Sequence, residues 1–226
     1  MGQQRGKDNQ HRRKAKLPPG LSPAGAGLDS ELRIIGGHFR GRKLRYHGDP
    51  IVRPMKHRVR EAIFNLISTE SAGRHAIDLF AGTGALGLEA LSRGATSATF
   101  IERHVPSAKL VEDNIAQLGV GDRVQLRITS AFLWGKRDLG SSSESPPADL
   151  PWLVFCSPPY SFFLEREAEM LELIRAIAEH APPASTLVIE SDQQFDFASL
   201  IEENQAKWDV RDYPPARVGI WRLNNS

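Results

Sequence analysis

The sequence predicts an α/β fold: a doubly wound, mostly parallel sheet with helices on both faces. Two observations support this prediction. From residue 75 onward, short apolar runs alternate with amphipathic stretches in the order strand, helix, strand, which is typical of parallel sheets. The last part of the chain, residues 207–223, then carries two strand-like runs joined by a bend with two prolines. We expect these two runs to close the sheet as an antiparallel hairpin.

Each element follows from its hydrophobic period and from the residues that end it. Glycines stand at the ends of two helix-like stretches, at Gly94 and Gly119, where helices commonly stop. The expected helices are 53–68, 85–94, 105–119 and 163–180. The expected strands are 75–81, 97–102, 123–128, 152–157, 186–191, 207–213 and 216–223. The prediction is therefore a seven-stranded sheet.

The first predicted helix, 53–68, has an apolar stripe and a basic side. Its apolar residues fall at the spacing i, i+3, i+4, i+7, i+8, which places them on one helical face: Val59, Ala62, Ile63, Leu66 and Ile67. Pro54 lies near the first turn, where proline is tolerated. The other side carries Lys56, Arg58 and Arg60. Before this helix, residues 31–46 alternate apolar and basic residues between glycines and predict a small hairpin.

The domain organisation follows from length and local composition. A chain of 226 residues suits one domain with an appendage. Residues 1–29 are rich in Gly, Pro, Gln and basic residues, with little to bury, and predict a disordered basic arm. Residues 30–226 form the expected domain, with a small basic β-hairpin extension at 30–54 and an α/β core at 55–226. Residues 140–149 are of low complexity and predict a surface loop.

Composition excludes several classes of protein. The single cysteine, Cys156, rules out a disulfide framework and fits a reducing cytoplasm. No Cys/His cluster has zinc spacing, so we expect no metal. No apolar run approaches the roughly 18 residues of a membrane span, and the amino terminus has no apolar segment of a signal peptide. We therefore expect a cytoplasmic monomer without membrane association.

The charge is distributed unevenly along the chain. Residues 1–60 carry 15 Lys and Arg against four acidic residues, a net charge of +11. The remaining 166 residues have a net charge of −9. A basic front half on an acidic body indicates a face that binds a polyanion such as a nucleic acid. For residues 1–16 a solvated basic tail is an equal alternative.

A glycine-rich loop follows the first predicted strand. Gly82, Gly84 and Gly87 have the spacing G-x-G-x-x-G between a strand and a helix, which allows close backbone approach to an adenosine cofactor. Glu102 ends the next strand, where its carboxylate can accept hydrogen bonds from ribose hydroxyls; the alternative is an exposed charge at a strand end. Asp78, four residues before Gly82, favours a cofactor with a cationic amino group over a pyrophosphate.

A second segment, "SPPY", follows the fourth predicted strand. In a doubly wound sheet this edge lies beside the bound ligand. Ser157 and a backbone carbonyl of Pro158 or Pro159 can accept the N–H bonds of an amino group, and proline offers no competing donor. Tyr160 supplies a face on which a base can stack. We expect Cys156 to pack inside the strand, which argues against a cysteine nucleophile.

The ordered set of motifs resembles one family. "RIIGGHFRGRKL", "RPMKHRVREAIFNLI", "DLFAGTGALGLEALSRGA", "FIE" and "SPPY" come in the order and spacing of the bacterial 16S ribosomal RNA guanine-N2 methyltransferases called RsmD. The resemblance covers about residues 32–222. It implies a Rossmann-like class I methyltransferase fold, S-adenosyl-L-methionine as cofactor, and a guanine amino group in small-subunit rRNA, free or in the assembling subunit, as acceptor.

The resemblance also implies roles for individual residues. The cofactor site would comprise Asp78, Phe80, Gly82, Gly84, Glu102, Ser130 and Ala131. The catalytic segment would be Ser157, Pro158, Pro159 and Tyr160. Contacts to RNA, or in part to the cofactor carboxylate, would come from Arg33, Arg40, Arg42, Arg53, Arg58 and Arg60. Phe132 either flanks the adenine or belongs to the core.

Two departures from the family pattern bear on activity. The family usually has Asp or Asn where this chain has Ser157, and Thr-Thr/Ser-Asp where it has Met55-Lys56-His57. A serine still accepts a hydrogen bond, so we expect a slower enzyme rather than an inactive one. On this basis Ser157→Asp is expected to raise activity on guanine.

Three alternatives stay open from the sequence. The first is an amino methyltransferase acting on adenine N6 or cytosine N4 of RNA or DNA, which Ser157 motivates. The second is a weakened or non-catalytic RNA-binding relative. The third is a nicotinamide-dependent enzyme, against which Asp78 argues.

Overall fold

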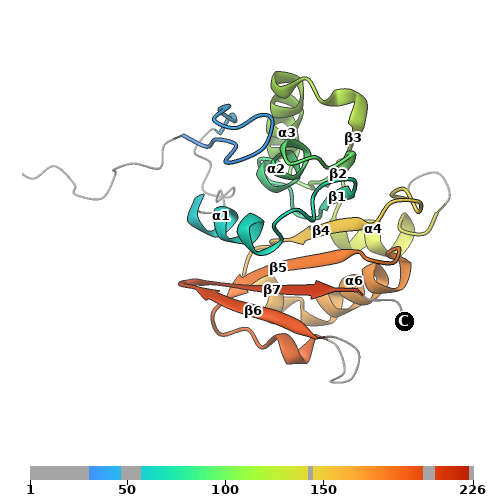
Figure 1. Cartoon of the computed structure of the whole chain (residues 1–226). Coiled ribbons are helices and arrows are strands. Elements are labelled where there is room, and N and C mark those ends of the chain that lie inside the picture. The colour runs from blue at the N-terminus through green and yellow to red at the C-terminus, as the bar shows by residue number, and fades with distance from the viewer. Residues whose placement is uncertain (1–30, 47–56, 142–144, 201–206, 224–226) are drawn as a thin grey trace, which may run out of the picture. The chain divides into compact units, whose positions relative to one another are not determined.

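The computed structural model describes residues 31–46, 57–141, 145–200 and 207–223 (Figure 1). They contain a seven-stranded sheet with the order β3-β2-β1-β4-β5-β7-β6. Neighbouring strands are parallel from β3 to β5, and β7 runs antiparallel to both β5 and β6. The strands are β1 His75–Asp78, β2 Ser97–Ile101, β3 Val124–Arg127, β4 Trp152–Cys156, β5 Thr186–Asp192, β6 Trp208–Tyr213 and β7 Ala216–Arg222. The predicted α/β sheet with a terminal antiparallel hairpin is confirmed.

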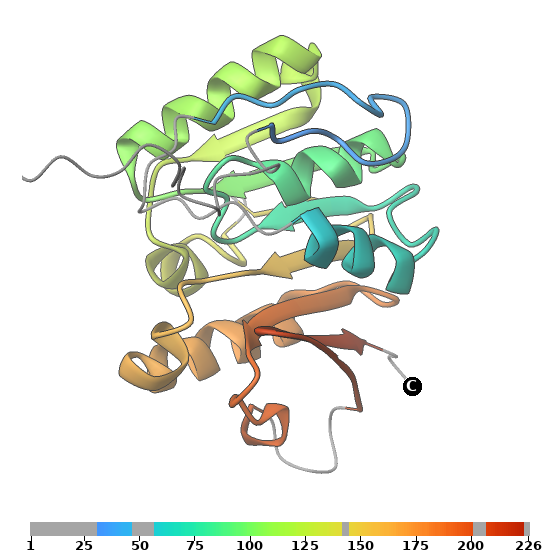
Figure 2. The same ribbon diagram turned by 90° about the vertical axis from the view of Figure 1, so that its left-hand side faces the viewer.

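Helices cover both faces of this sheet (Figure 2). They are α1 His57–Leu66, α2 Ala85–Ser92, α3 Val105–Leu118, α4 Ala131–Arg137, α5 Phe162–Glu165 and α6 Glu167–His180. Short 3-10 turns occupy Gly121–Arg123 and Phe197–Ser199. Helices α1, α2 and α3 pack in one hydrophobic cluster, and α4, α5 and α6 pack in a second one. This arrangement on two sides is the doubly wound fold that the alternation predicts.

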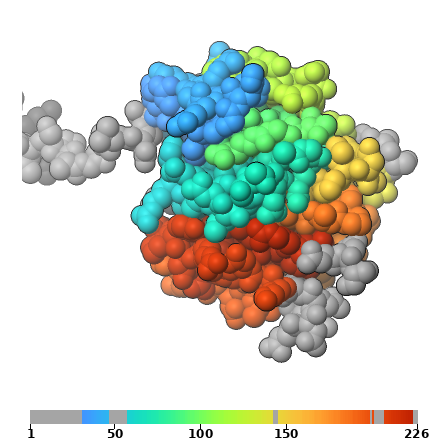
Figure 3. All heavy atoms as spheres, viewed as in Figure 1, coloured from blue at the N-terminus to red at the C-terminus, as the bar shows by residue number. Residues whose placement is uncertain are grey.

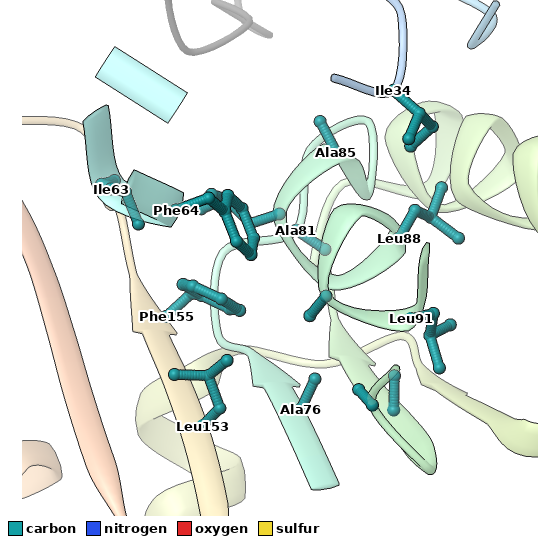
Figure 4. Packing of buried hydrophobic residues seen from close by; sticks show 14 of the residues in the cluster. Ile34, Ile63, Phe64, Ala76, Ala81, Ala85, Leu88, Leu91, Leu153 and Phe155 are labelled. Atoms are coloured by element: carbon teal, nitrogen blue, oxygen red, sulfur yellow. The ribbon is translucent and has the colours of Figure 1, made fainter. Parts of the chain in front are cut away.

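The residues of β4 show how one strand supplies both clusters. Leu153 and Phe155 point to the side of α1 and α2, where Phe155 lies 5.6 Å from the ring of Phe64 (Figure 4). Trp152, Val154 and Cys156 belong to the other cluster. Successive side chains of a strand point to opposite faces, so a strand buried on both sides is apolar at every position. As expected, Cys156 is buried in the strand.

Several elements differ from their predicted extent. Helix α4 lies between β3 and β4, where no helix is predicted; it has only seven residues, among them Gly135, and too few turns to show a period. The predicted helix 163–180 is interrupted at Arg166, which separates α5 from α6. Residues 53–56 of the first predicted helix lie outside the described residues.

The predicted hairpin at 31–46 forms a loop with one antiparallel bridge, Arg33 to Lys43, instead of two strands. Its apolar side chains Ile34, Phe39 and Leu44 are buried against the α2 and α3 side of the core. In the space-filling view this segment (blue) borders α3 (yellow-green) on the surface (Figure 3). Docking onto helices, rather than strand pairing, therefore holds the segment in place.

No described helix combines the length and the apolar character that crossing a bilayer requires. No group of three or more His, Cys, Asp or Glu side chains in the described ranges could hold a metal ion.

Candidate functional site

The predicted site residues gather at the carboxyl ends of the parallel strands. The chain leaves β1 toward β2 and β3 on one side, and β4 then returns to the other side of β1. Ligands of doubly wound sheets bind at such a reversal of strand order. Asp78 ends β1, Glu102 follows β2, and Ser157 follows β4. These three polar side chains therefore surround the position where a ligand is expected.

Asp78 is buried, and one of its carboxylate oxygens lacks a partner. Oδ2 accepts a hydrogen bond from the backbone N–H of Gly87 at 3.1 Å. Oδ1 has no hydrogen-bond partner among the described residues. Burial raises the pKa of this carboxyl to about 7. A buried oxygen without a partner is costly, and a cationic amino group bound beside it would satisfy it and lower the pKa. The site thus fits a cofactor that carries an amino group.

The three glycines of the loop have different roles. Gly82 is half-buried and Gly84 buried, with left-handed φ angles of 56° and 77°. A Cβ atom at Gly84 would contact Val111 at 3.3 Å, and one at Gly87 would lie 2.4 Å from the buried Phe100 ring. Gly84 and Gly87 therefore allow α2 to pack closely on the sheet.

Glu102 is bound to the glycine loop. Its Oε2 accepts a hydrogen bond from the backbone N–H of Gly82 at 2.8 Å, and Oε1 accepts from His104 N at 2.7 Å. Glu102 is thus not an isolated charge at a strand end. Each carboxylate oxygen can accept more than one hydrogen bond, so the side chain retains capacity for the hydroxyls of a ribose.

An aromatic cluster joins the segments that follow β1, β3 and β4. The rings of Phe80, Phe132 and Phe162 lie within 5.9–6.1 Å of one another. The Arg166 guanidinium lies 4.0 Å from the centroid of Phe132. Phe132 is buried in the second cluster, which places it in the core, next to Phe80. Ser130 and Ala131 lie at the start of α4, directly before this ring.

The two proline carbonyls of the "SPPY" segment differ in their hydrogen bonding. Pro159 is exposed and its carbonyl accepts from Phe162 N at 2.9 Å. Pro158 is buried, and its carbonyl accepts no hydrogen bond from the residues that the structure describes. Of the two carbonyls considered from the sequence, that of Pro158 is therefore the available acceptor.

Glu190, near the end of β5, is a site residue that the sequence analysis does not identify. Its Oε2 accepts a hydrogen bond from Ser157 Oγ at 2.5 Å, and its Oε1 accepts from Tyr160 OH at 2.8 Å. Burial raises the pKa of the Glu190 carboxyl. The sequence contained one indication of this role. Glu190 is a carboxylate near the end of an apolar strand, at the same sheet edge as Asp78 and Glu102.

The six arginines that were assigned to RNA lie in different environments. Arg33, Arg40 and Arg42 lie together on the segment 31–46, and Arg40 and Arg42 are exposed. Arg58 is exposed on α1, and Arg53 lies outside the described residues. These placements bring at least three of the predicted basic side chains to one surface segment.

The assignment of Arg60 to RNA is wrong. Its side chain is wholly buried, and Nη2 donates to the carbonyl of Arg33 at 2.5 Å. Nε and Nη1 have no partner among the described residues, and burial lowers the pKa of the guanidinium. The helical period places Arg60 outside the apolar stripe, but the segment 31–46 covers that side of α1. A phosphate cannot reach it in this conformation.

Comparisons with known proteins identify relatives of this chain. Over 195 residues the chain is 38% identical to ribosomal RNA small subunit methyltransferase D of Escherichia coli strain K12, covering 85% of this chain and 89% of the relative. The solved yhhF protein of Escherichia coli superposes with a TM-score of 0.70 at 26% identity, covering 87% of this chain and 99% of that one.

A more distant solved structure has the same fold. An RNA methyltransferase from Salinibacter ruber, solved in complex with S-adenosyl-L-homocysteine, has a TM-score of 0.54 at 19% identity and covers 77% of this chain and 95% of its own. The family model described as Conserved hypothetical protein 95 matches residues 32–216. The chain therefore belongs to this family, and the resemblance to RsmD methyltransferases that its motifs indicated is confirmed.

Proposed function

We propose that the protein transfers a methyl group from S-adenosyl-L-methionine to the exocyclic N2 amino group of a guanine in small-subunit ribosomal RNA. The observation that carries the proposal is the meeting of two half-sites at one sheet edge. Asp78 and Glu102 form the half-site that fits the cofactor, and Ser157 to Tyr160 form the half-site that fits an amino group. The relative named ribosomal RNA small subunit methyltransferase D supports small-subunit ribosomal RNA as the substrate.

The residues on the cofactor side would bind S-adenosyl-L-methionine and fix its orientation. Asp78 would accept a hydrogen bond from the amino group with its unpaired Oδ1, and Glu102 would accept from the ribose hydroxyls. Phe80, Ser130 and Ala131 would line the adenine. When bound, S-adenosyl-L-methionine supplies an electrophilic methyl group on a positively charged sulfur. Holding donor and acceptor in one geometry is the main rate contribution expected of such a site.

On the acceptor side, the amino group of the base is a weak nucleophile. The lone pair of a base amino group is delocalised into the ring, so acceptors must hold its N–H bonds and turn the lone pair toward the methyl group. Ser157 Oγ and the Pro158 carbonyl are two acceptors at the end of β4. Tyr160, which is partly exposed, would stack on the base.

RNA would bind through phosphate contacts. Arg33, Arg40 and Arg42 on the segment 31–46, Arg58 on α1 and Arg53 would supply the positive charge. Residues 1–29 would act as a basic arm that adds affinity, while residues 30–226 form the methyltransferase domain. Such contacts are sensitive to salt and largely independent of sequence. We propose that the protein acts as a cytoplasmic monomer on this RNA, either free or in an assembling small subunit.

The test is transfer of tritiated methyl groups to under-methylated small ribosomal particles, followed by nucleoside analysis of the product. N2-methylguanosine is the expected product. Methylated adenosine or cytidine would instead identify the second candidate, an amino methyltransferase with another base. No incorporation by a protein that binds S-adenosyl-L-homocysteine, as measured by calorimetry, would identify a non-catalytic RNA-binding protein.

A further inference from the structure

We propose that Glu190 is a positioning residue that makes the acceptor site selective for an amino group. It does so by fixing the hydroxyl protons of Ser157 and Tyr160 toward itself, which leaves the lone pairs of Ser157 Oγ for one N–H bond of the acceptor and holds the Tyr160 ring in place for stacking. This inference rests on the proposed function and deepens it. It assigns a role in acceptor recognition to a residue of β5 outside the "SPPY" segment.

The sheet register brings these groups together. Cys156 of β4 pairs with Ile189 of β5, so the next residues, Ser157 and Glu190, lie side by side at the strand ends. Ser157 Oγ donates to Oε2 at 2.5 Å and Tyr160 OH donates to Oε1 at 2.8 Å. Both carboxylate oxygens are thus engaged by hydroxyls of the acceptor segment.

The burial of Glu190 is not explained by packing. The residue is only 6% exposed, and no ion pair links it to a Lys, Arg or His among the described residues. Placing a carboxylate in such a position without a cationic partner costs stability, because two neutral hydroxyls compensate only part of the lost hydration. A residue that destabilises the fold in this way calls for a functional explanation.

The chemistry of the groups sets the direction of the hydrogen bonds. An ionised carboxylate only accepts, whereas a hydroxyl has one proton to donate and two lone pairs. Once Ser157 and Tyr160 each donate to Glu190, they can only accept from anything else. The site therefore favours a substrate group with N–H donors and disfavours a ring nitrogen or a carbonyl oxygen, which would find no donor there.

The same bonds change the character of the side chain at position 157, which is a neutral serine. Hydrogen bonding to Glu190 makes the Ser157 oxygen a stronger acceptor, because the donated proton is drawn toward a negative charge. The site therefore contains a negative charge on Glu190, which is one hydrogen bond away from Ser157 Oγ.

The decisive variant is Glu190→Gln. Glutamine has nearly the same shape and can accept from one hydroxyl while donating to the other, so both contacts can persist without the charge. We expect the unfolding temperature to stay equal or to rise, because a buried charge is removed, and the affinity for S-adenosyl-L-homocysteine to stay unchanged, while kcat for methyl transfer falls by about ten- to a hundredfold. Asp192→Asn, which removes a nearby carboxylate of β5 not bonded to the acceptor segment, is the matched control and should keep kcat within about threefold.

Rescue separates positioning from a structural role. In the double variant Ser157→Asp/Glu190→Gln, the amide of residue 190 can donate to the new carboxylate, whose second oxygen is free to accept from the substrate. We expect kcat to recover at least about tenfold relative to Glu190→Gln alone. Ser157→Asp alone is the reference, and an equal gain in the wild-type and Glu190→Gln backgrounds would contradict the positioning role.

A third readout does not depend on activity. Burial, and after it the Glu190 carboxylate, raises the pKa of the Tyr160 phenol. With ¹³C-labelled tyrosine, Glu190→Gln should shift the Tyr160 titration to lower pH. An active wild-type enzyme with unaltered kcat in Glu190→Gln would overturn this inference alone. Absence of methyl transfer to guanine by the wild type, with cofactor product still bound, would instead overturn the proposed function.

Discussion

The buried carboxylate of Glu89 accepts hydrogen bonds from the backbone N–H groups of Ile35 and Gly36, at 2.7 and 2.8 Å. It also pairs with Arg93 one turn later, at 2.8 Å. Glu89 lies on α2, directly after the glycine loop. This single side chain therefore connects the basic segment 31–46 to the helix that follows the candidate cofactor loop.

The isosteric change Glu89→Gln should destabilise the protein strongly. The amide NH₂ of glutamine would face a backbone N–H, so one buried donor loses its acceptor and Arg93 loses its counter-ion. We expect the free energy of unfolding, measured with urea, to fall by about 2–4 kcal/mol. Trypsin should also cleave at Arg40 or Arg42 faster than in the wild type.

Glu112→Gln is the control for this prediction, because the Glu112 side chain is half exposed and, within the described part of the chain, pairs with Lys109 on the surface of α3. Its loss should cost less than about 0.5 kcal/mol. Equal losses of stability in the two variants would contradict the anchoring role of Glu89.

Cofactor affinity should depend on pH through Asp78. Burial raises the pKa of Asp78 to about 7, and a cationic amino group binds only the ionised carboxylate. Below this pKa a proton must leave before binding, so the Kd for S-adenosyl-L-homocysteine should rise about tenfold from pH 8 to pH 6. Calorimetry on Asp78→Asn should show weak binding without this slope, whereas His104→Gln should retain it. A slope that survives in Asp78→Asn would disprove the assignment.

Acid should destabilise the protein through His75. Burial lowers the pKa of this imidazole to about 4, and its ring nitrogens contact Ser97 and Thr99 at 2.7 and 2.9 Å. As the pH falls below about 6.5, the unfolded chain binds a proton that the folded chain does not, so stability is lost between about pH 6.5 and pH 4.

The stability that is lost through His75 should be measured as a difference between the wild type and the His75→Gln variant. Relative to His75→Gln, the wild type should lose about 2–3 kcal/mol between pH 7 and pH 4.5. The comparison is needed because Asp78, with its raised pKa, changes stability in the opposite direction over the same range. Parallel stability curves for the two proteins would refute the prediction.

RNA affinity should depend on salt, with Arg40 contributing one phosphate contact. Arg40 is exposed and has no ion-pair partner among the described residues. Arg40→Ala should weaken binding similarly for all RNA sequences and lower the slope of log affinity against log salt by about 0.7–0.9. Arg211→Ala, on β6 and paired with Asp209, should leave the slope unchanged. Fluorescence titrations at several salt concentrations measure both, and equal slopes for Arg40→Ala and the wild type would exclude the contact.

Much of the site could be predicted because the relevant signals are local. The positions of Asp78, Gly82 and Glu102 relative to their strands can be read from short stretches, and parallel strands bring their carboxyl ends to one edge. Helix α4 could not be predicted in the same way, because seven residues with an internal glycine show no period.

Whether a side chain is buried was harder to predict than which helix or strand it belongs to. The helical period assigns Arg60 to a solvent-exposed side, but α1 is covered both by the sheet and by residues 31–46. The spacing of apolar residues identifies one buried face of a helix. It does not show whether a second segment covers another face of the same helix. The same limit concealed Glu190, whose strand pattern resembles an ordinary core strand ending in polar residues.

The sequence by itself determined the order of the strands along the chain, the family, and the sheet edge where the candidate site lies. Only the tertiary structure decided which groups are bonded there: Glu190 to Ser157 and Tyr160, and Glu89 to the segment 31–46. The physical reason is distance along the chain. Partners 30 or more residues apart meet only after strand register and helix docking are set, and no local pattern encodes either one.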